Sequence, residues 1–484
     1  MNIIAKLKLF CRKYPHLSSL YPFVVILAVN MVVLLRYPYR LLFGDAGGYM
    51  DLSKLFIVND HFSLLNYHDM LRGYFLPLIL QVPIQLSNLT GLDELTCYRF
   101  LSAIMASVCF AVLFPFCFEQ LFGFRARPWT KLIFALLVTF FWYGNYAYPL
   151  SDFPALTFFL SGLTLCLVAV RSDRGLWAKG GLIIAAGVCL AAATSIRISY
   201  LIPFFISLVF LLLRLTFSKN TMIAKSVLPL LLIAGCVIVF VPQALSNKIH
   251  YQENTPFQIN RLADNTSLTK AQLYYGFVVQ RIDFGNIESP DQSVPALVFR
   301  DYQGLEIAEK YMEKYGISAS NVSTAPLARI AVDIVVHQPL DIAAIYIRHV
   351  FNGLDVVYPY GYVPDFHSKD QIIYRFVNYT LWFLAISLLW RRGINLRQDR
   401  HAIIGCFIVM LPALVAIPSQ MEIRFFLPIH MLLYAWVSFM LLSKRDHCKQ
   451  LLTWRSAISY ISFIVVCFAW SSYLFSTAGV LLQN

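Results

Sequence analysis

Apolar residues occur in long, nearly uninterrupted runs along most of the chain. A helix rises about 1.5 Å per residue, so a hydrocarbon core of about 30 Å needs roughly 20 consecutive apolar residues. We expect a membrane-spanning helix in each such run, and these lie near residues 19–37, 99–122, 131–148, 153–170, 180–196, 198–216, 226–243, 373–390, 402–418, 424–442 and 456–474. The pattern therefore predicts an all-α polytopic membrane protein with about 11 spans.

A single long polar stretch, residues 244–372, interrupts this pattern. It divides the chain into an N-terminal transmembrane module (1–243) and a C-terminal transmembrane module (373–484). The periodicity of its apolar residues predicts helices over Asp301–Tyr315 and Thr324–His337. We therefore expect a larger α-rich domain outside the membrane.

Residues 72–90 are apolar enough to span, but they contain Pro77 and Pro83. A crossing there would place the basic loop at Arg125 on the outer side of the membrane, contrary to the preference of basic loops for the cytoplasm. We therefore expect a helix that lies in the membrane interface, within a first outer loop of residues 38–98.

The charge distribution predicts the orientation of these spans. The chain of 484 residues is 58% hydrophobic and 13% charged, with a formal net charge of +13. Lys and Arg concentrate in the N-terminus and in short loops, which favours a cytoplasmic location for those segments: Lys6–Lys13, Arg125–Lys131, Arg171–Lys179, Lys219–Lys225, Arg391–Arg400 and Lys444–Arg455. The positive charge thus reflects topology, and no nucleic-acid partner is expected. We expect a bacterial inner membrane, with a cytoplasmic N-terminus, a first span retained as an anchor and the functional face periplasmic; the endoplasmic reticulum membrane is the alternative.

Several signatures of soluble enzymes are missing from the sequence. The Gly44–Gly48 stretch is not followed by Lys-Ser/Thr, so it is not a phosphate-binding loop, and no G-x-G-x-x-G motif opens a helix after a strand. The chain has neither a C-x-x-C pair nor H-E-x-x-H, so a Cys/His zinc site is not expected.

Two isolated acids lie just beyond predicted spans on the outer face. Asp45 follows the first span, and Asp152 precedes the fourth. Either acid alone is equally well explained as a helix N-cap. Together, they form the kind of carboxylate pair that acid–base catalysis or a shared divalent metal ion requires.

Other charged residues lie at the same boundary. Arg197 opens a span and would clamp a phosphate, although snorkelling to lipid headgroups is the simpler explanation. Glu422 and Arg424 form a solvated ion pair or one wall of a site. His68 and Arg72 flank the interfacial segment. They are either solvated loop residues or contacts to the headgroup of a substrate. The nearby aromatics are explained as an interfacial belt: Trp142, Tyr143, Tyr146 and Tyr148.

The order of these residues resembles that of the GT-C superfamily of membrane glycosyltransferases. Asp45 has a tyrosine, Tyr49, four residues on, and a proline-containing interfacial segment follows. Asp152 starts the fourth span, Arg197 opens the sixth, and Glu-x-Arg-Phe-x-Leu-Pro occurs at 422–428. The superfamily includes protein O-mannosyltransferases and enzymes that modify lipid A or O-antigen. Ala46 stands where many relatives have a second acid, and this leaves metal dependence and substrate class open.

The resemblance implies a GT-C-like bundle and a polyprenyl-phosphate sugar donor that enters from the membrane lipid. The acceptor would be a glycan, lipid or protein hydroxyl. Asp45 would act as general base with inversion at the anomeric carbon, and Asp152 would assist through a hydrogen bond or a shared divalent metal. Arg197 and Arg424 would stabilise the departing phosphate. The other substrate-binding residues would be Tyr49, His68, Arg72 and Glu422.

Two other classes of protein also fit many spans with a large outer loop. An O-antigen-type polymerase or ligase would use Arg281, Arg300 or His349 of that loop. A lipid-linked saccharide transporter or flippase would have polar residues in mid-bilayer and related halves, neither of which is clear in this sequence.

Overall fold

The computed structural model describes residues 15–217, 221–262, 267–288, 296–317, 327–366, 368–392, 400–441, 453–476 and 480–481. Parts of several predicted features lie outside the described residues: the basic N-terminus, Lys219, most of the basic loops Arg391–Arg400 and Lys444–Arg455, and the first three residues of the helix expected at Thr324.

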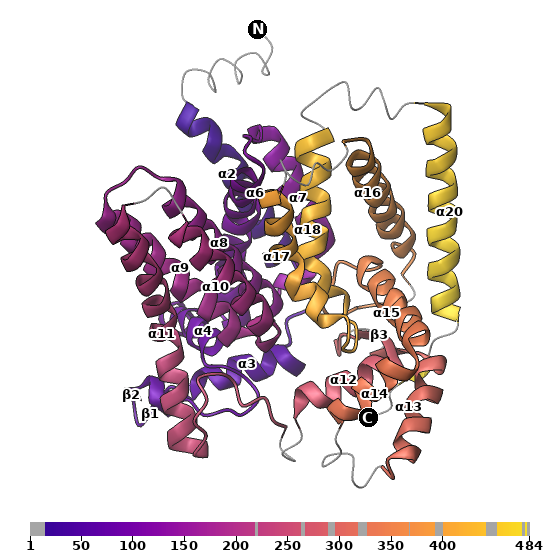
Figure 1. Ribbon diagram of the computed structural model, residues 1–484, viewed down its shortest axis with the longest axis horizontal. Coiled ribbons are helices and arrows are strands. Elements are labelled where there is room, and N and C mark those ends of the chain that lie inside the picture. Colours follow the sequence, from indigo (N-terminus) through magenta and orange to yellow (C-terminus); the bar gives the residue numbers. More distant parts are fainter. Residues whose placement is uncertain are drawn as a thin grey trace.

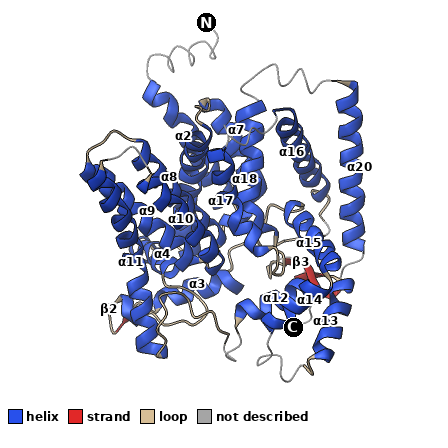
Figure 2. Cartoon of the chain, in the orientation of Figure 1, coloured by secondary structure: helices blue, strands red, loops and turns tan. Residues whose placement is uncertain are grey.

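The predicted helical membrane fold is confirmed, since each run expected to span is helical (Figures 1 and 2). The helices are α2 (Pro15–Leu35), a continuous rod of α5 (Glu94–Val108), η2 (Cys109–Leu113) and α6 (Phe114–Phe122), α7 (Pro128–Tyr146), α8 (Asp152–Arg171), α9 (Leu176–Ile196), η3 (Ile198–Tyr200) with α10 (Leu201–Thr216), α11 (Met222–Tyr251), α16 (Gln371–Arg392), α17 (Arg400–Ala416), η5 (Ile423–Phe426) with α18 (Leu427–Ala435) and η6 (Trp436–Leu441), and α20 (Trp454–Ser476). Within the described part of the chain, eight helices are long and apolar enough to cross a membrane by themselves, and α2 and α17 have shorter apolar stretches.

Residues 38–98, the segment expected to form the first outer loop, fold into short elements. They are α3 (Gly44–Lys54), the hairpin β1 (Ile57–Val58) and β2 (His61–Phe62), η1 (Leu64–Asn66) and α4 (Phe75–Thr90). The helix α4 is the one expected over 72–90, and it packs against α3, α5 and α9. It ends at Gly91, whose left-handed conformation (φ 73°) terminates the helix.

The polar stretch 244–372 is helical but also contributes two strands to a small sheet that the sequence did not predict. Its helices are α12 (Leu268–Val278), α13 (Tyr302–Lys314), α14 (Leu327–His337) and α15 (Pro339–Leu354). The strands β3 (Val279–Phe284) and β4 (Ala296–Arg300) pair antiparallel, and β5 (Val480–Leu481), which follows α20, pairs with β4. Five of the six residues of β3 are buried, so the apolar–polar alternation that marks a half-exposed strand is absent.

The aromatic residues at the outer end of α7 are not an interfacial belt. Trp142 and Tyr146 are 1% exposed, and Tyr148 is completely buried. They pack inside the bundle, because the loop before α16 and the ends of α2 and α5 cover this end of α7: Tyr148 contacts Tyr37, and its backbone oxygen accepts a hydrogen bond from Tyr98. The interpretation as a lipid-facing belt was therefore wrong for these three residues.

Two glycines bring α9 and α11 into close contact. A Cβ on Gly187 would collide with the backbone of Leu232, and a Cβ on Gly235 would collide with that of Ile184. Small residues at such crossings let helix backbones approach closely in membranes. Because α9 ends at Ile196, this contact also fixes the position of the next residue, Arg197.

Candidate functional site

Asp45 lies at the start of α3, but it does not cap the helix. The N-cap is Phe43, and the left-handed Gly44 (φ 53°) turns the chain into the helix. Asp45 instead points to two arginines: its Oδ1 is 2.6 Å from Arg72 Nη2, and its Oδ2 is 3.5 Å from Arg424 Nη2. The carboxylate is 37% exposed, so substrate can approach it.

Asp152 likewise does not cap its helix. Ser151 is the N-cap residue of α8, and Asp152 follows it inside the first turn. Its Oδ1 is 2.7 Å from Arg197 Nη1, and its Oδ2 is 3.4 Å from Arg424 Nε. For both acids, the N-cap explanation is therefore wrong, because their carboxylates pair with guanidinium groups instead.

Arg197 is fixed by extended backbone between α9 and η3 (φ −148°, ψ 118°). Its guanidinium donates hydrogen bonds of 3.1 Å to the hydroxyls of Ser151 and Ser199. It also lies over the ring of Phe425, 4.4 Å from the ring centroid. These contacts orient the guanidinium toward the protein interior rather than toward lipid headgroups.

Arg424 joins the three acids of this cluster. Besides its contacts with Asp45 and Asp152, its Nε donates a 2.7 Å hydrogen bond to Glu422 Oε2. Glu422 and Arg424 belong to the turn before α18, so the C-terminal module reaches the acids of the N-terminal module. The site thus contains three carboxylates and three guanidinium groups.

The arginines set the ionisation of the acids. Burial by itself would raise the pKa of Asp45, but Arg72, Arg424 and Arg197 outweigh it and hold that pKa below its ordinary value. Burial raises the pKa of Glu422, and the nearby Asp152 and Asp45 add to this effect while Arg424 opposes it. Asp45 is therefore ionised at neutral pH.

These groups surround a cavity of about 530 Å³. Six of the eight residues that the sequence marked as catalytic or substrate-binding line it, namely Asp45, Tyr49, Arg72, Arg197, Glu422 and Arg424. Tyr49 is nearly buried, and its hydroxyl accepts a 3.3 Å hydrogen bond from Arg72. Asp152 lies behind the arginines in a narrow adjoining pocket.

His68 does not line this cavity. Its side chain is exposed; its Nδ1 lies 2.8 Å from the backbone oxygen of Asn66, and its ring lies 5.2 Å from that of His250 in a tilted arrangement. The structure thus separates His68 from the other marked residues.

The cavity also has polar residues that the sequence did not single out. Gln258, Asn260, Gln272 and Gln420 contribute carboxamides, and Tyr362 lies over the start of α3 with its hydroxyl 3.4 Å from the amide nitrogen of Ala46. Of these residues, only Tyr362 had a signal in the sequence, the cluster of tyrosines at 358–362. The four carboxamide residues had none, because uncharged polar residues in a polar loop form no recognisable pattern.

The two aspartates do not fit a shared divalent cation. The Arg424 guanidinium lies between them and contacts both. In the described residues, no group of three or more His, Cys, Asp or Glu side chains is placed to hold a metal.

The residues expected for a polymerase or ligase lie elsewhere. Arg281 is fully buried and makes two 2.8 Å hydrogen bonds to the carboxylate of Asp283. His349 is buried with its Nδ1 2.7 Å from the backbone oxygen of Ile417. Neither these two nor Arg300 lines the cavity that contains Asp45.

Comparisons with known proteins give a remote likeness. No family model and no curated protein matches the chain. Matching solved structures are of the oligosaccharyltransferase of Archaeoglobus fulgidus: AglB in complex with an inhibitory peptide and a dolichol-phosphate (98% of this chain, 57% of that one) and the apo form (97% and 57%), both with 14% identity and a TM-score of 0.48. This chain therefore spans just over half the length of those proteins.

Proposed function

We propose that the protein is a membrane glycosyltransferase that transfers a sugar from a polyprenyl-phosphate donor to an acceptor hydroxyl on the extracytoplasmic face. The observation that carries the proposal is the meeting of one accessible carboxylate, Asp45, with three guanidinium groups at a cavity beside the ends of apolar helices. A phosphorylated lipid needs cations for its phosphate and a hydrocarbon route for its chain. A bacterial inner membrane with this face periplasmic is the location we propose.

In this reaction, Asp45 acts as general base. The acceptor oxygen attacks the anomeric carbon from the side opposite the phosphate, the proton of the hydroxyl passes to an oxygen of Asp45, and the bond from carbon to phosphate oxygen breaks. The lipid phosphate leaves with the bonding electron pair, and the configuration inverts. General bases of this kind contribute typically 10² to 10⁴-fold to the rate.

The arginines stabilise the charge that develops on the leaving phosphate. Arg197 and Arg424 are already oriented by Asp152, which touches both guanidinium groups and is proposed as a positioning residue. When Arg72 and Arg424 turn toward a bound phosphate, their hold on Asp45 weakens and its pKa rises. Donor binding thus makes Asp45 a stronger base.

The experiment is sugar transfer from defined polyprenyl-phosphate sugars by the purified protein in detergent. Asp45→Asn keeps the size of the side chain but removes the base, so turnover falls by about 10² to 10⁴-fold. Asp51→Asn is the matched control, since Asp51 lies on the same helix with its side chain 78% exposed, and it retains the wild-type rate. Full activity of Asp45→Asn would remove Asp45 from the mechanism, and failure to use any such donor would contradict the proposed reaction.

A further inference from the structure

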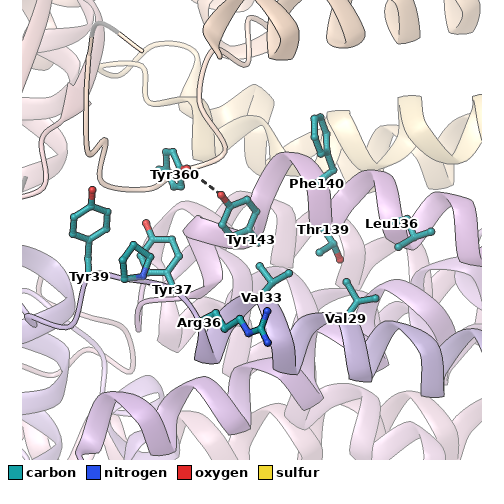
Figure 3. Close-up of a pocket in the computed structure, with 11 residues that line it drawn as sticks. Val29, Val33, Arg36, Tyr37, Tyr39, Leu136, Thr139, Phe140, Tyr143 and Tyr360 are labelled. Atoms are coloured by element: carbon teal, nitrogen blue, oxygen red, sulfur yellow. Dashed lines mark hydrogen bonds between the residues drawn. The ribbon is translucent and has the colours of Figure 1, made fainter. Parts of the chain in front are cut away.

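A second cavity lies between α2 and α7, on the other side of the loop Tyr358–Tyr362 from Asp45. Its volume is about 470 Å³. In Figure 3, Val29, Val33 and Arg36 of the α2 segment lie on one side, and Leu136, Thr139 and Tyr143 of α7 on the other. None of the groups in the proposed mechanism lines it.

The apolar part of this cavity opens toward the bilayer. Val33 and Leu136 belong to apolar runs that the sequence predicts to span the membrane, and Leu136 and Phe140 remain 38% and 39% exposed. Because such surface on a membrane helix faces hydrocarbon, a lipid chain can enter the cavity without crossing water.

The other end of the cavity is polar and incompletely paired. Tyr37 is 3% exposed, and its hydroxyl has no hydrogen-bond partner in the structure. Leaving a buried hydroxyl without a hydrogen-bond partner costs free energy, so an acceptor oxygen from a ligand would stabilise this group. Arg36 lies beside it with an exposed side chain and has no ion pair within the described part of the chain.

We propose that this cavity binds an anionic glycerophospholipid of the surrounding bilayer. Its acyl chain packs between α2 and α7, an ester carbonyl accepts a hydrogen bond from the Tyr37 hydroxyl, and its phosphate pairs with Arg36. The chemistry favours this occupant: a free phosphate would leave the apolar walls unused, and a polyprenyl phosphate has no ester carbonyl for Tyr37.

The bound lipid would also contact the loop that borders the proposed active site. Tyr360 lines the lipid cavity, and its hydroxyl is 3.0 Å from that of Tyr143. Two residues on, Tyr362 lines the cavity of Asp45. Lipid occupancy therefore stabilises the loop between the two cavities.

The test is native mass spectrometry of the purified full-length protein after delipidation and addition of phosphatidylglycerol, phosphatidylcholine or a polyprenyl phosphate. Phosphatidylglycerol should be retained preferentially, and Arg36→Gln should weaken its retention about tenfold, as expected for loss of one charge-assisted hydrogen bond. Tyr37→Phe removes only the hydroxyl and should weaken retention of both phospholipids. Arg40→Gln is the control, because Arg40 is an exposed cation nearby that does not line the cavity.

Equal retention by the wild type and both Arg36→Gln and Tyr37→Phe would overturn the proposal. Equal retention of phosphatidylcholine and phosphatidylglycerol would also overturn it, since the charge of the headgroup would then be irrelevant. Preferential retention of the polyprenyl phosphate would replace it with a substrate site. Because binding is measured without sugar transfer, failure here leaves the proposed reaction unaffected.

Discussion

The pairing of Asp45 with arginines determines how its ionisation responds to pH. Its pKa lies below the ordinary value of an aspartate, about 3.9, so the carboxylate is ionised above that pH and becomes protonated only as the pH falls through the lowered pKa. We expect kcat/KM to remain flat on the acidic side until about pH 4. Arg72→Gln removes the 2.6 Å contact with the guanidinium that lowers this pKa most, so it raises the pKa of Asp45 and moves the loss of activity to higher pH.

The pH profile distinguishes this effect from a simple loss of substrate binding, which would lower kcat/KM equally at every pH. Lys54→Gln is the control, because Lys54 is an exposed cation on α3, the helix of Asp45, but pairs with Asp51 rather than with Asp45. An unchanged profile in Arg72→Gln would mean that Asp45 is not the group whose protonation limits the rate.

At the residue scale, the sequence identified most of the charged groups but not their contacts. Isolated acids and arginines beside apolar runs are conspicuous, since charges are rare there. What the sequence could not predict is that Arg424 touches Asp45, because the two are 379 positions apart. The local sequence fitted a helix N-cap equally well for Asp45 and Asp152. Only the tertiary contacts decide between an N-cap and a role in the site.

The crossing of α9 and α11 yields a prediction at the scale of the elements. Gly187→Leu places a side chain against the backbone of α11 and should destabilise the protein by about 1–3 kcal/mol, the usual cost of overpacking. Gly181→Leu is a matched control on the same helix, because a Cβ there meets no atom within 4 Å. Thermal unfolding in detergent measures both. Equal midpoints for the two variants would show that the helices separate without cost.

The spanning helices were predictable because apolar runs of the required length have few alternatives in a membrane. Their ends were less predictable: α11 continues to Tyr251, eight residues past the expected end, through the polar residues Asn247, Lys248 and His250. These residues hydrogen-bond outside the apolar layer, and Asn247 donates to the backbone oxygens of Thr255 and Phe257. The apolar run ends where the hydrocarbon layer ends, whereas the helix continues until its backbone groups find other hydrogen-bond partners.

At the scale of the whole molecule, the division into two transmembrane modules does not coincide with the site. Asp45, Arg72, Asp152 and Arg197 come from the N-terminal module, and the turn with Glu422 and Arg424 comes from the C-terminal one. The site is therefore complete only when both modules and the intervening polar domain have folded together. A polar stretch that separates two apolar regions in sequence need not separate them in function.

The orientation predicted from the charged loops is testable by cysteine labelling. Asn59→Cys, at the tip of the β1–β2 hairpin, and Leu92→Cys, just after α4, should react with a membrane-impermeant maleimide in intact cells. Ser172→Cys, in the basic loop after α8, should react only after permeabilisation, since basic loops favour the cytoplasm. The unsubstituted protein gives the background from its native cysteines.

Leu92 carries the decisive information, because it reports whether α4 crosses the membrane. With 16 residues, α4 is about 24 Å long, shorter than a hydrocarbon core of about 30 Å. If Leu92→Cys reacts only after permeabilisation while Asn59→Cys reacts in intact cells, α4 does cross. Arg125 and its neighbours would then face the same side as Asp45, contrary to the positive-inside rule. Labelling of both positions in intact cells keeps Asp45, Asp152 and Arg424 on one face, as a single site requires.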